Sequence, residues 1–317
     1  MIKFRNLAMM LAATTTTALA ADNFKYADEQ FADIQMLRYK VENFDQLSLR
    51  QKTLVYYLSE AALQGRDILF DQNGRYNLRI RRMLETVYTD YKGDRETAEF
   101  KALTVYLKQV WFSSGIYHHY GSEKFVPGFS QDYLRKVLAE VDINKLPLEP
   151  GQSLDDFCNE VFPAIFDPTF YPMRVNQRAG DDLVLTSGEN YYGEGVTQKE
   201  AEDFYAARKD LSDPEPVMFG LNSRLVKENG KLVEKVWKED GLYGPAIKRI
   251  IYYLEKARPF ADTPEQAKVI DKLISYYRTG NLKTFDEYNI LWLQDTAGTV
   301  DFTNGFIETY GDPLGMK

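Results

Sequence analysis

The chain has little of the side-chain chemistry on which most enzymes depend. Cys158 is the one cysteine among 317 residues, so an intramolecular disulfide is excluded and stability must come from a buried core. The two histidines, His118 and His119, are adjacent. Neighbouring side chains point to opposite faces of a strand and diverge on a helix, so we expect this pair not to chelate one metal ion. The sequence therefore offers no metal ligand.

Motifs for nucleotide binding and nucleophilic catalysis are also lacking. The chain has no nucleophile elbow, no Walker loop and no G-x-G-x-x-G after a strand. Gly193-Glu194-Gly195 comes nearest to the glycine-rich motif, but it precedes a helix cap and therefore predicts a turn. Cys158 lies on a predicted helix face and is typical of a buried structural cysteine. No catalytic residue can be named.

The first twenty residues have the pattern of a secretory signal peptide. Lys3 and Arg5 precede an apolar run over residues 7–13, and Ala20 ends a small-residue cleavage site. The run is too short to span a bilayer permanently. An ordinary N-terminal helix is the alternative. We predict cleavage after Ala20, export across the inner membrane, a periplasmic location and no membrane association after cleavage.

The charge balance limits the partners. Removing Lys3 and Arg5 with residues 1–20 takes the net charge from −8 to −10. A nucleic acid or an anionic membrane is therefore excluded as a partner, and cationic or amine-bearing ligands fit better.

Start signals followed by helical periodicity predict several helices. Ser48 and Gln51 form a capping box before a helix that ends near Gly65. Further helices are predicted over residues 77–91, 97–112, 245–257, 263–277 and 282–292, and further N-caps at Ser130, Ser153 and Thr197.

Two segments favour strands. Residues 183–186 form a short β-prone run, and Asn229-Gly230 between alternating residues is a strong hairpin signal. Residues 300–310 are predicted to be extended at their start. We expect an α+β fold, mainly helical with a small antiparallel sheet, organised as a helical block (21–180), a mixed block (181–240) and helices leading into a strand (241–317).

Acidic residues gather near the end of the chain. Asp301, Glu308 and Asp312 lie close to Asn304. Carboxylates on an extended segment can hold a peptide's ammonium group through charge-assisted hydrogen bonds. On spacing alone, solvated side chains are the alternative interpretation.

The same region carries a resemblance to a known family. Trp292-Leu293-Gln294-Asp295, Val300-Asp301 and the stretch Gly305-Phe306-Ile307-Glu308-Thr309-Tyr310-Gly311-Asp312-Pro313 resemble the dipeptidyl peptidase III family. Segments that begin at Leu47, Gly121 and Asn222 follow in the family's order and approximate spacing. The resemblance covers nearly all of the chain after residue 20.

The resemblance implies a fold and an activity. Members of the family are two-lobed zinc exopeptidases that release dipeptides from the N-termini of short peptides, and their H-E-x-x-G-H motif lies in a helical lobe. This chain resembles an incomplete lower lobe, the one that carries a small β-barrel, and the zinc lobe is absent. Zinc is therefore expected for the complete protein, while this chain can bind none and requires the missing C-terminal lobe as a partner.

Substrate-binding residues also follow from the resemblance. Asp301 matches the acidic residue that helps to hold the peptide's free amine, and Tyr120 matches an aromatic residue of the cleft. Tyr117 and Asn304 are neighbours of matched positions. Thr303 stands where some members have a tyrosine that assists amine binding, which puts that contact in doubt.

Two functional hypotheses follow. The first is a fragment of a dipeptidyl peptidase III-like zinc metallopeptidase that contributes part of the substrate-binding lobe and is inactive alone. The alternative is a non-catalytic periplasmic protein that binds peptides or another partner. A fragment is expected to expose an apolar face and aggregate, whereas a complete binding protein is expected to unfold cooperatively.

Overall fold

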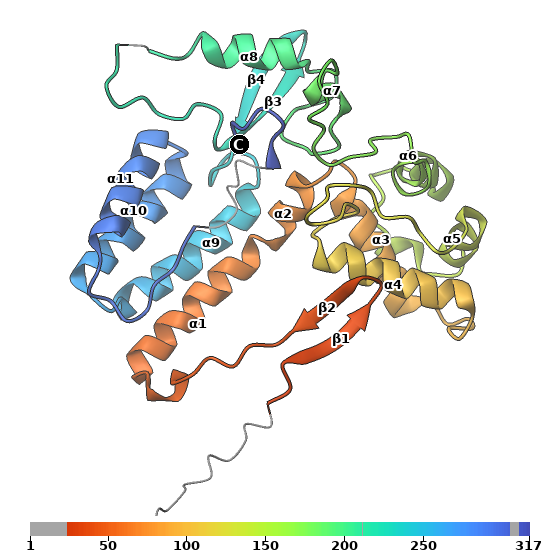
Figure 1. Cartoon of the computed structure of the whole chain (residues 1–317), viewed down its shortest axis with the longest axis horizontal. Coiled ribbons are helices and arrows are strands. Elements are labelled where there is room, and N and C mark those ends of the chain that lie inside the picture. The colour runs from red at the N-terminus through yellow and green to blue at the C-terminus, as the bar shows by residue number, and fades with distance from the viewer. Residues whose placement is uncertain (1–23, 211, 305–310) are drawn as a thin grey trace, which may run out of the picture. The chain divides into compact units, whose positions relative to one another are not determined.

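The computed structural model describes residues 24–210, 212–304 and 311–317 (Figure 1). The predicted signal peptide over residues 1–20 lies outside this range. The chain divides into two units, Met1–Glu42 and Asn43–Lys317. Within the described residues, none of the helices has the length and apolar character needed to cross a membrane.

The first unit contains a hairpin that the sequence analysis missed. Strands β1 (Ala27–Phe31) and β2 (Ile34–Leu37) pair in antiparallel fashion. Ala32 lies in the turn with φ 48, a left-handed conformation that glycine or asparagine usually supplies. The turn therefore lacks the residues by which hairpins are recognised in sequence, and the expectation of helix throughout this part of the chain was wrong for these two strands.

The second unit is mostly helical. It contains α1 (Leu49–Gln64), α2 (Arg66–Gln72), α3 (Asn77–Asp90), α4 (Ala98–Phe112), α5 (Gln131–Leu138), α6 (Leu154–Phe166), α7 (Leu183–Thr186), α8 (Gln198–Ala206), α9 (Gly244–Ala257), α10 (Pro264–Thr279) and α11 (Leu282–Gln294). Short 3-10 helices lie at Phe44–Gln46, Ile143–Lys145 and Arg258–Phe260.

Side-chain caps begin the helices as predicted. The hydroxyl of Ser48 accepts a hydrogen bond from Gln51 N while the Gln51 side chain accepts one from Ser48 N, which completes the capping box. Ser130, Ser153 and Thr197 cap α5, α6 and α8. Each cap satisfies an N–H group that has no partner inside its helix.

The Asn229-Gly230 hairpin is also confirmed. Strands β3 (Ser223–Glu228) and β4 (Lys231–Val236) pair in antiparallel fashion. Asn229 has φ 51 and Gly230 φ 76, as expected for a two-residue turn with positive φ at both positions. The described residues thus combine many helices with two separate two-stranded sheets, which confirms the α+β class.

Residues 183–186 form α7 and not the strand predicted for them. The Asp182 side chain accepts hydrogen bonds from Val184 N at 3.1 Å and Leu185 N at 2.9 Å. This cap closes a helical turn, and it outweighs the β propensity of a four-residue apolar run. Residues 301–304 likewise form neither strand nor helix, and residues 305–310 lie outside the described part of the chain.

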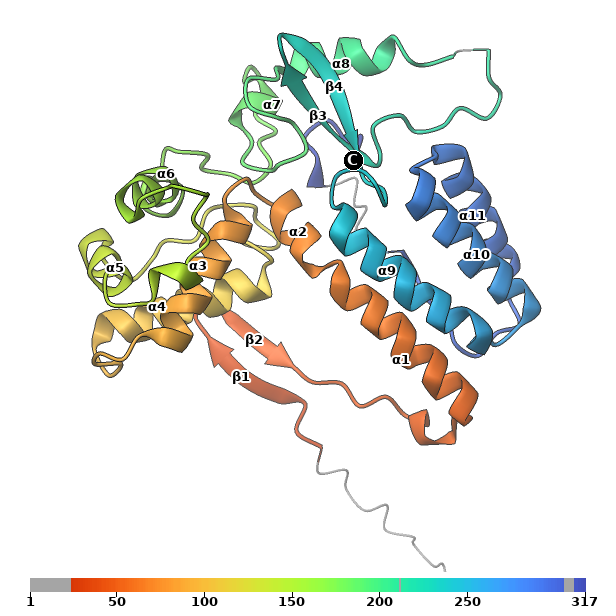
Figure 2. The ribbon, with the colours of Figure 1, turned by 180° about the vertical axis from the view of Figure 1, so that it is seen from behind.

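One hydrophobic cluster lies under α1, α9, α10 and α11. Helix α1 packs along α9, and α10 packs against both α9 and α11 (Figures 1 and 2). Leu54 of α1, Ile247 of α9 and Ile270 of α10 have no exposed surface. Trp237, after β4, and Tyr192 join the same cluster, so the hairpin is anchored to the helices.

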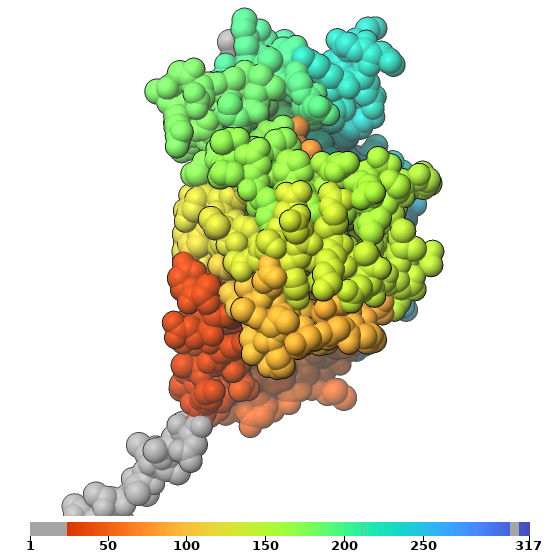
Figure 3. All heavy atoms as spheres, turned by 90° about the vertical axis from the view of Figure 1, so that its right-hand side faces the viewer, coloured from red at the N-terminus to blue at the C-terminus, as the bar shows by residue number. Residues whose placement is uncertain are grey.

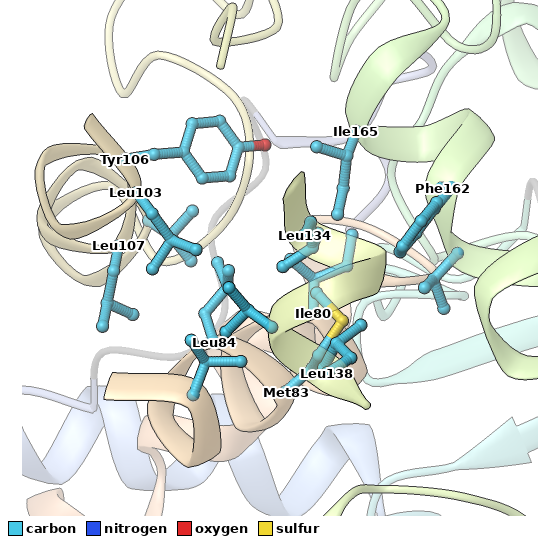
Figure 4. Packing of buried hydrophobic residues seen from close by; sticks show 14 of the residues in the cluster. Ile80, Met83, Leu84, Leu103, Tyr106, Leu107, Leu134, Leu138, Phe162 and Ile165 are labelled. Carbon is cyan, nitrogen blue, oxygen red and sulfur yellow. The ribbon is translucent and has the colours of Figure 1, made fainter. Parts of the chain in front are cut away.

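A second cluster lies among α3, α4, α5 and α6. Their apolar side chains point toward one another in Figure 4, among them Leu84 of α3, Leu103 of α4, Leu134 of α5 and Phe162 of α6. Cys158 belongs to this cluster and is buried. Burial raises the pKa of its thiol, in agreement with a structural role.

In Figure 3 the orange-yellow to yellow-green segments that include α4, α5 and α6 occupy the middle of the view.

Candidate functional site

Asp301 presents an exposed carboxylate that is held in one orientation. It follows α11 in the chain, and its Oδ1 accepts hydrogen bonds from Trp292 Nε1 at 2.9 Å and Phe302 N at 2.7 Å. Among the described residues, no hydrogen bond reaches its Oδ2. An exposed carboxylate with one oxygen fixed and the other available is suited to hold an ammonium group.

Asn304 is anchored on α10. Its Oδ1 accepts a hydrogen bond from the Tyr277 hydroxyl. Burial raises the pKa of Tyr277, so this residue remains a neutral hydroxyl donor. Asn304 Nδ2 is buried and has no partner in the part of the chain that the structure describes. A buried donor without a partner is costly, and a carbonyl group of a bound molecule would satisfy it.

A cavity of about 310 Å³ lies beside these residues. Phe302, Thr303 and Asn304 form part of its wall, and the remainder is mostly apolar: Leu58, Ala61, Ala62, Gly65, Leu69, Ile250, Leu254, Leu273 and Tyr277. Such a wall suits an apolar side chain, with a few polar atoms at its edge to orient the molecule.

Tyr117 and Tyr120 differ in environment. Tyr117 is buried, its hydroxyl donates to Tyr171 O at 3.0 Å, and burial raises its pKa. Tyr120 is 87% exposed, and its ring centroid lies 4.3 Å from that of His119. The ring of Tyr120 is therefore available to a ligand, whereas the hydroxyl of Tyr117 is used to connect its own segment to Tyr171.

The structure does not bring the four predicted residues into one constellation. Within residues 24–210, 212–304 and 311–317, no hydrogen bond or ring contact joins Asp301 or Asn304 to Tyr117 or Tyr120. Tyr117 belongs to the cluster of α3 to α6, whereas Phe302, next to Asp301, packs against the cluster of α1, α9 and α10. The substrate-binding role of all four remains a prediction.

The histidine pair does not diverge as expected. The chain forms neither a strand nor a helix at this point, and the two rings stack with centroids 4.5 Å apart. His118 Nδ1 accepts hydrogen bonds from Tyr120 N at 3.2 Å and Gly121 N at 3.1 Å. This nitrogen therefore faces backbone donors and is engaged with them.

No group of three or more His, Cys, Asp or Glu side chains in the described residues could hold a metal ion. The described residues therefore do not fit a zinc site. Zinc remains an expectation for a longer protein.

Comparison with known proteins connects the chain to one group of peptidases. The model of peptidase family M49 matches residues 220–317, the part that includes Asp301 and Asn304. Dipeptidyl peptidase 3 of Homo sapiens is 23% identical over 319 residues, and that of Dictyostelium discoideum is 22% identical over 301. Each match covers 87% of this chain. The chain is therefore similar in sequence to part of the dipeptidyl peptidase III family.

The fold is also similar to part of a solved structure from this family. The structure of dipeptidyl peptidase III from Caldithrix abyssi superimposes with a TM-score of 0.54 at 18% identity, covering 86% of this chain and 38% of that one. The chain spans 41% of the length of the human and Dictyostelium relatives. The likeness therefore concerns part of a dipeptidyl peptidase III fold.

Two features of the surroundings of Asp301 and Asn304 were not foreseen from the sequence. Trp292 belongs to the matched motif, but its hydrogen bond to Asp301 depends on how the chain turns after α11. The cavity beside Asn304 depends on the packing of α1 against α9 and α10, which follow it in the chain only after some 180 residues. A Trp–Asp pair nine residues apart carries no recognisable local signal.

Proposed function

We propose that the chain is part of a dipeptidyl peptidase III-like zinc metallopeptidase that releases dipeptides from the N-termini of short peptides. In this proposal the chain supplies a surface that binds the free amino end of the peptide. The Trp292-oriented carboxylate of Asp301 supports it most directly. Asp301 holds the ammonium group, and the cavity beside Asn304 takes an apolar side chain.

The chain alone is proposed to be inactive. Zinc and its ligands would be supplied by a further part of the protein, because the described residues offer no set of ligands for it. Export to the periplasm after cleavage at Ala20 also belongs to this proposal. A peptidase outside the inner membrane would meet short peptides with free N-termini.

Amine recognition can be tested by calorimetric titration of the chain with an apolar tripeptide and with its N-acetylated form. The free peptide is expected to bind more tightly, and Asp301→Asn is expected to weaken its binding by roughly tenfold or more, because a charge-assisted hydrogen bond is lost. Asp240→Asn removes an equal charge from a residue that pairs with Lys248 and is the matched control. Equal affinity for both peptides would contradict the proposal.

Trp292→Phe tests the orienting role of the indole. It keeps the aromatic ring but removes the N–H that donates to Asp301. We expect weaker binding of the free peptide and unchanged binding of the acetylated one. A loss of affinity for both peptides would instead indicate a general packing defect.

Catalysis separates the proposal from a non-catalytic peptide-binding protein. The chain supplied with zinc is expected to leave dipeptidyl-arylamide substrates uncut, and turnover would overturn its assignment as an inactive part. The protein purified from its source is expected to exceed 36.7 kDa and to contain zinc. A mass equal to the processed short chain, without zinc, would favour the binding protein.

A further inference from the structure

A second, larger cavity lies away from Asp301 and has a different chemistry. Its volume is about 620 Å³, and it opens between the end of α1, the start of α3, α2 and the N-terminus of α9, elements that can be followed in Figures 1 and 2. Neither Asp301 nor Asn304 contributes to its wall.

Arginine dominates the wall. Four guanidinium groups, of Arg66, Arg82, Arg224 and Arg249, face two carboxylates, of Asp67 and Asp71. The chain as a whole has a net charge of −8. The cavity is thus a local region of positive charge on an acidic protein, and a concave, low-dielectric wall strengthens the field of such a region.

The two carboxylates are already engaged. Asp67 accepts hydrogen bonds from Arg81 at 2.8 Å and Arg82 at 3.0 Å. Asp71 pairs with Arg224 and accepts a hydrogen bond from the Tyr243 hydroxyl at 2.7 Å. These pairs fix the half-buried base of the cavity, where Arg224 Nε is buried without a partner among the described residues.

The guanidinium groups at the rim are less engaged. Arg249 donates to the neutral side chain of Gln64 at 2.8 Å, and no ion pair of Arg66 or Arg249 occurs in the described residues. Both side chains are exposed. A guanidinium group without a carboxylate partner retains its planar set of donors for an incoming oxyanion.

The N-terminus of α9 contributes a further positive element. Tyr243, at its N-cap, has φ 62 and makes no side-chain capping hydrogen bond, while Gly244 N donates to Gly241 O at 3.1 Å. Pro245 has no N–H group, and Ala246 lines the cavity in the first turn. The N-terminus of a fourteen-residue helix favours a negative charge in front of it.

We propose that this cavity binds an oxyanion, a carboxylate or a phosphate group, between Arg66, Arg249 and the N-terminus of α9. Arg224 and Tyr243 form the base of the site and hold its shape. The site is independent of amine recognition at Asp301, because the two share no residue.

Calorimetric titration of the full chain with inorganic phosphate and, separately, with N-acetylglutamate tests the proposal. We expect saturable binding of at least one probe, weakened as the salt concentration is raised. Binding of phosphate alone would assign the ligand as a phosphate, and binding of N-acetylglutamate alone as a carboxylate. Absence of saturable binding of both probes by the folded chain would overturn the proposal.

The rim arginines provide the variants. Arg66→Gln combined with Arg249→Gln is expected to raise the Kd by about tenfold or more, since each lost guanidinium group removes charge-assisted hydrogen bonds. Lys256→Gln combined with Lys268→Gln is the matched control, because it also removes two positive charges and both residues lie outside the cavity. Unchanged affinity in the double variant would overturn the assignment. Asp301→Asn is expected to leave phosphate and N-acetylglutamate binding unaltered. A negative result for amine recognition at Asp301 would therefore leave oxyanion binding in this cavity standing.

Discussion

Individual side chains in this protein are placed in environments that alter their chemistry, and Glu189 is the clearest case. It is fully buried, and burial together with the nearby charge of Asp312 raises its pKa to about 8. Its Oε2 accepts a hydrogen bond from Tyr191 N, and Arg75 and Lys317 exert a weaker opposing effect. The folded chain therefore keeps a proton on this group that the unfolded chain releases near pH 4.5.

This difference predicts a pH dependence of stability. Between about pH 4.5 and 8 the folded state binds more protons at Glu189 than the unfolded state, so stability falls as the pH rises through this window. Glu189→Gln is expected to reduce the dependence of the free energy of unfolding on pH. Relative to wild type, the free energy of unfolding of the variant is expected to be higher at pH 8 than at pH 5 by about 1–3 kcal/mol. Urea unfolding at both pH values measures it. An equal slope in both proteins would contradict a buried proton on Glu189.

At the scale of elements, the sequence predicted correctly those helices and strands whose formation depends on residues only a few positions apart. The Ser48 capping box and the Asn229-Gly230 turn act within a few residues, so their consequences can be read from the chain. Residues 183–186 formed a helix because Asp182 caps them, and β1 with β2 escaped recognition because Ala32 supplies the left-handed turn residue. Short elements are decided by one hydrogen bond or one dihedral angle, and propensity is too weak to predict them.

The β3–β4 turn gives a prediction at this scale. Gly230 has φ 76, and an added Cβ would meet nothing within 4 Å, so Gly230→Ala introduces backbone strain without a clash. We expect it to lower the free energy of unfolding by about 1 kcal/mol. Gly298→Ala, at a glycine outside the left-handed region, is the control in the same denaturation experiment. An equally small effect at both positions would show that the turn is not strained by alanine.

At the scale of the whole molecule, the sites depend on contacts between distant segments. The orientation of Asp301 was not predictable because its donor, Trp292, approaches only after the chain turns beyond α11. Each cavity lies where helices near the start of the second unit, α1 and α2, meet the much later helix α9. The resemblance could therefore name Asp301 and Asn304, but it gave neither the anchor of the carboxylate nor the arginine-lined cavity.

Helix α2 joins the two hydrophobic clusters of the second unit. Ile68 packs in the cluster of α1, α9 and α10, whereas Phe70, two residues later, packs in that of α3 to α6, and both are buried. Because one short helix is shared, we expect the two clusters to unfold together. Phe70→Ala is expected to cost about 3–5 kcal/mol and to uncouple them.

Two tryptophans allow this prediction to be checked. Trp237 is buried in the first cluster, and Trp111 lies at the end of α4 with its ring centroid 6.0 Å from that of Tyr88, which packs on the second. Variants that keep only one of these two, in a background that also carries Trp292→Phe, report each cluster by fluorescence during urea unfolding. Coincident midpoints are expected with Phe70 present and separate midpoints in Phe70→Ala, since a cooperative transition requires shared packing. Separate midpoints already in the wild-type background would show that α2 does not couple the clusters.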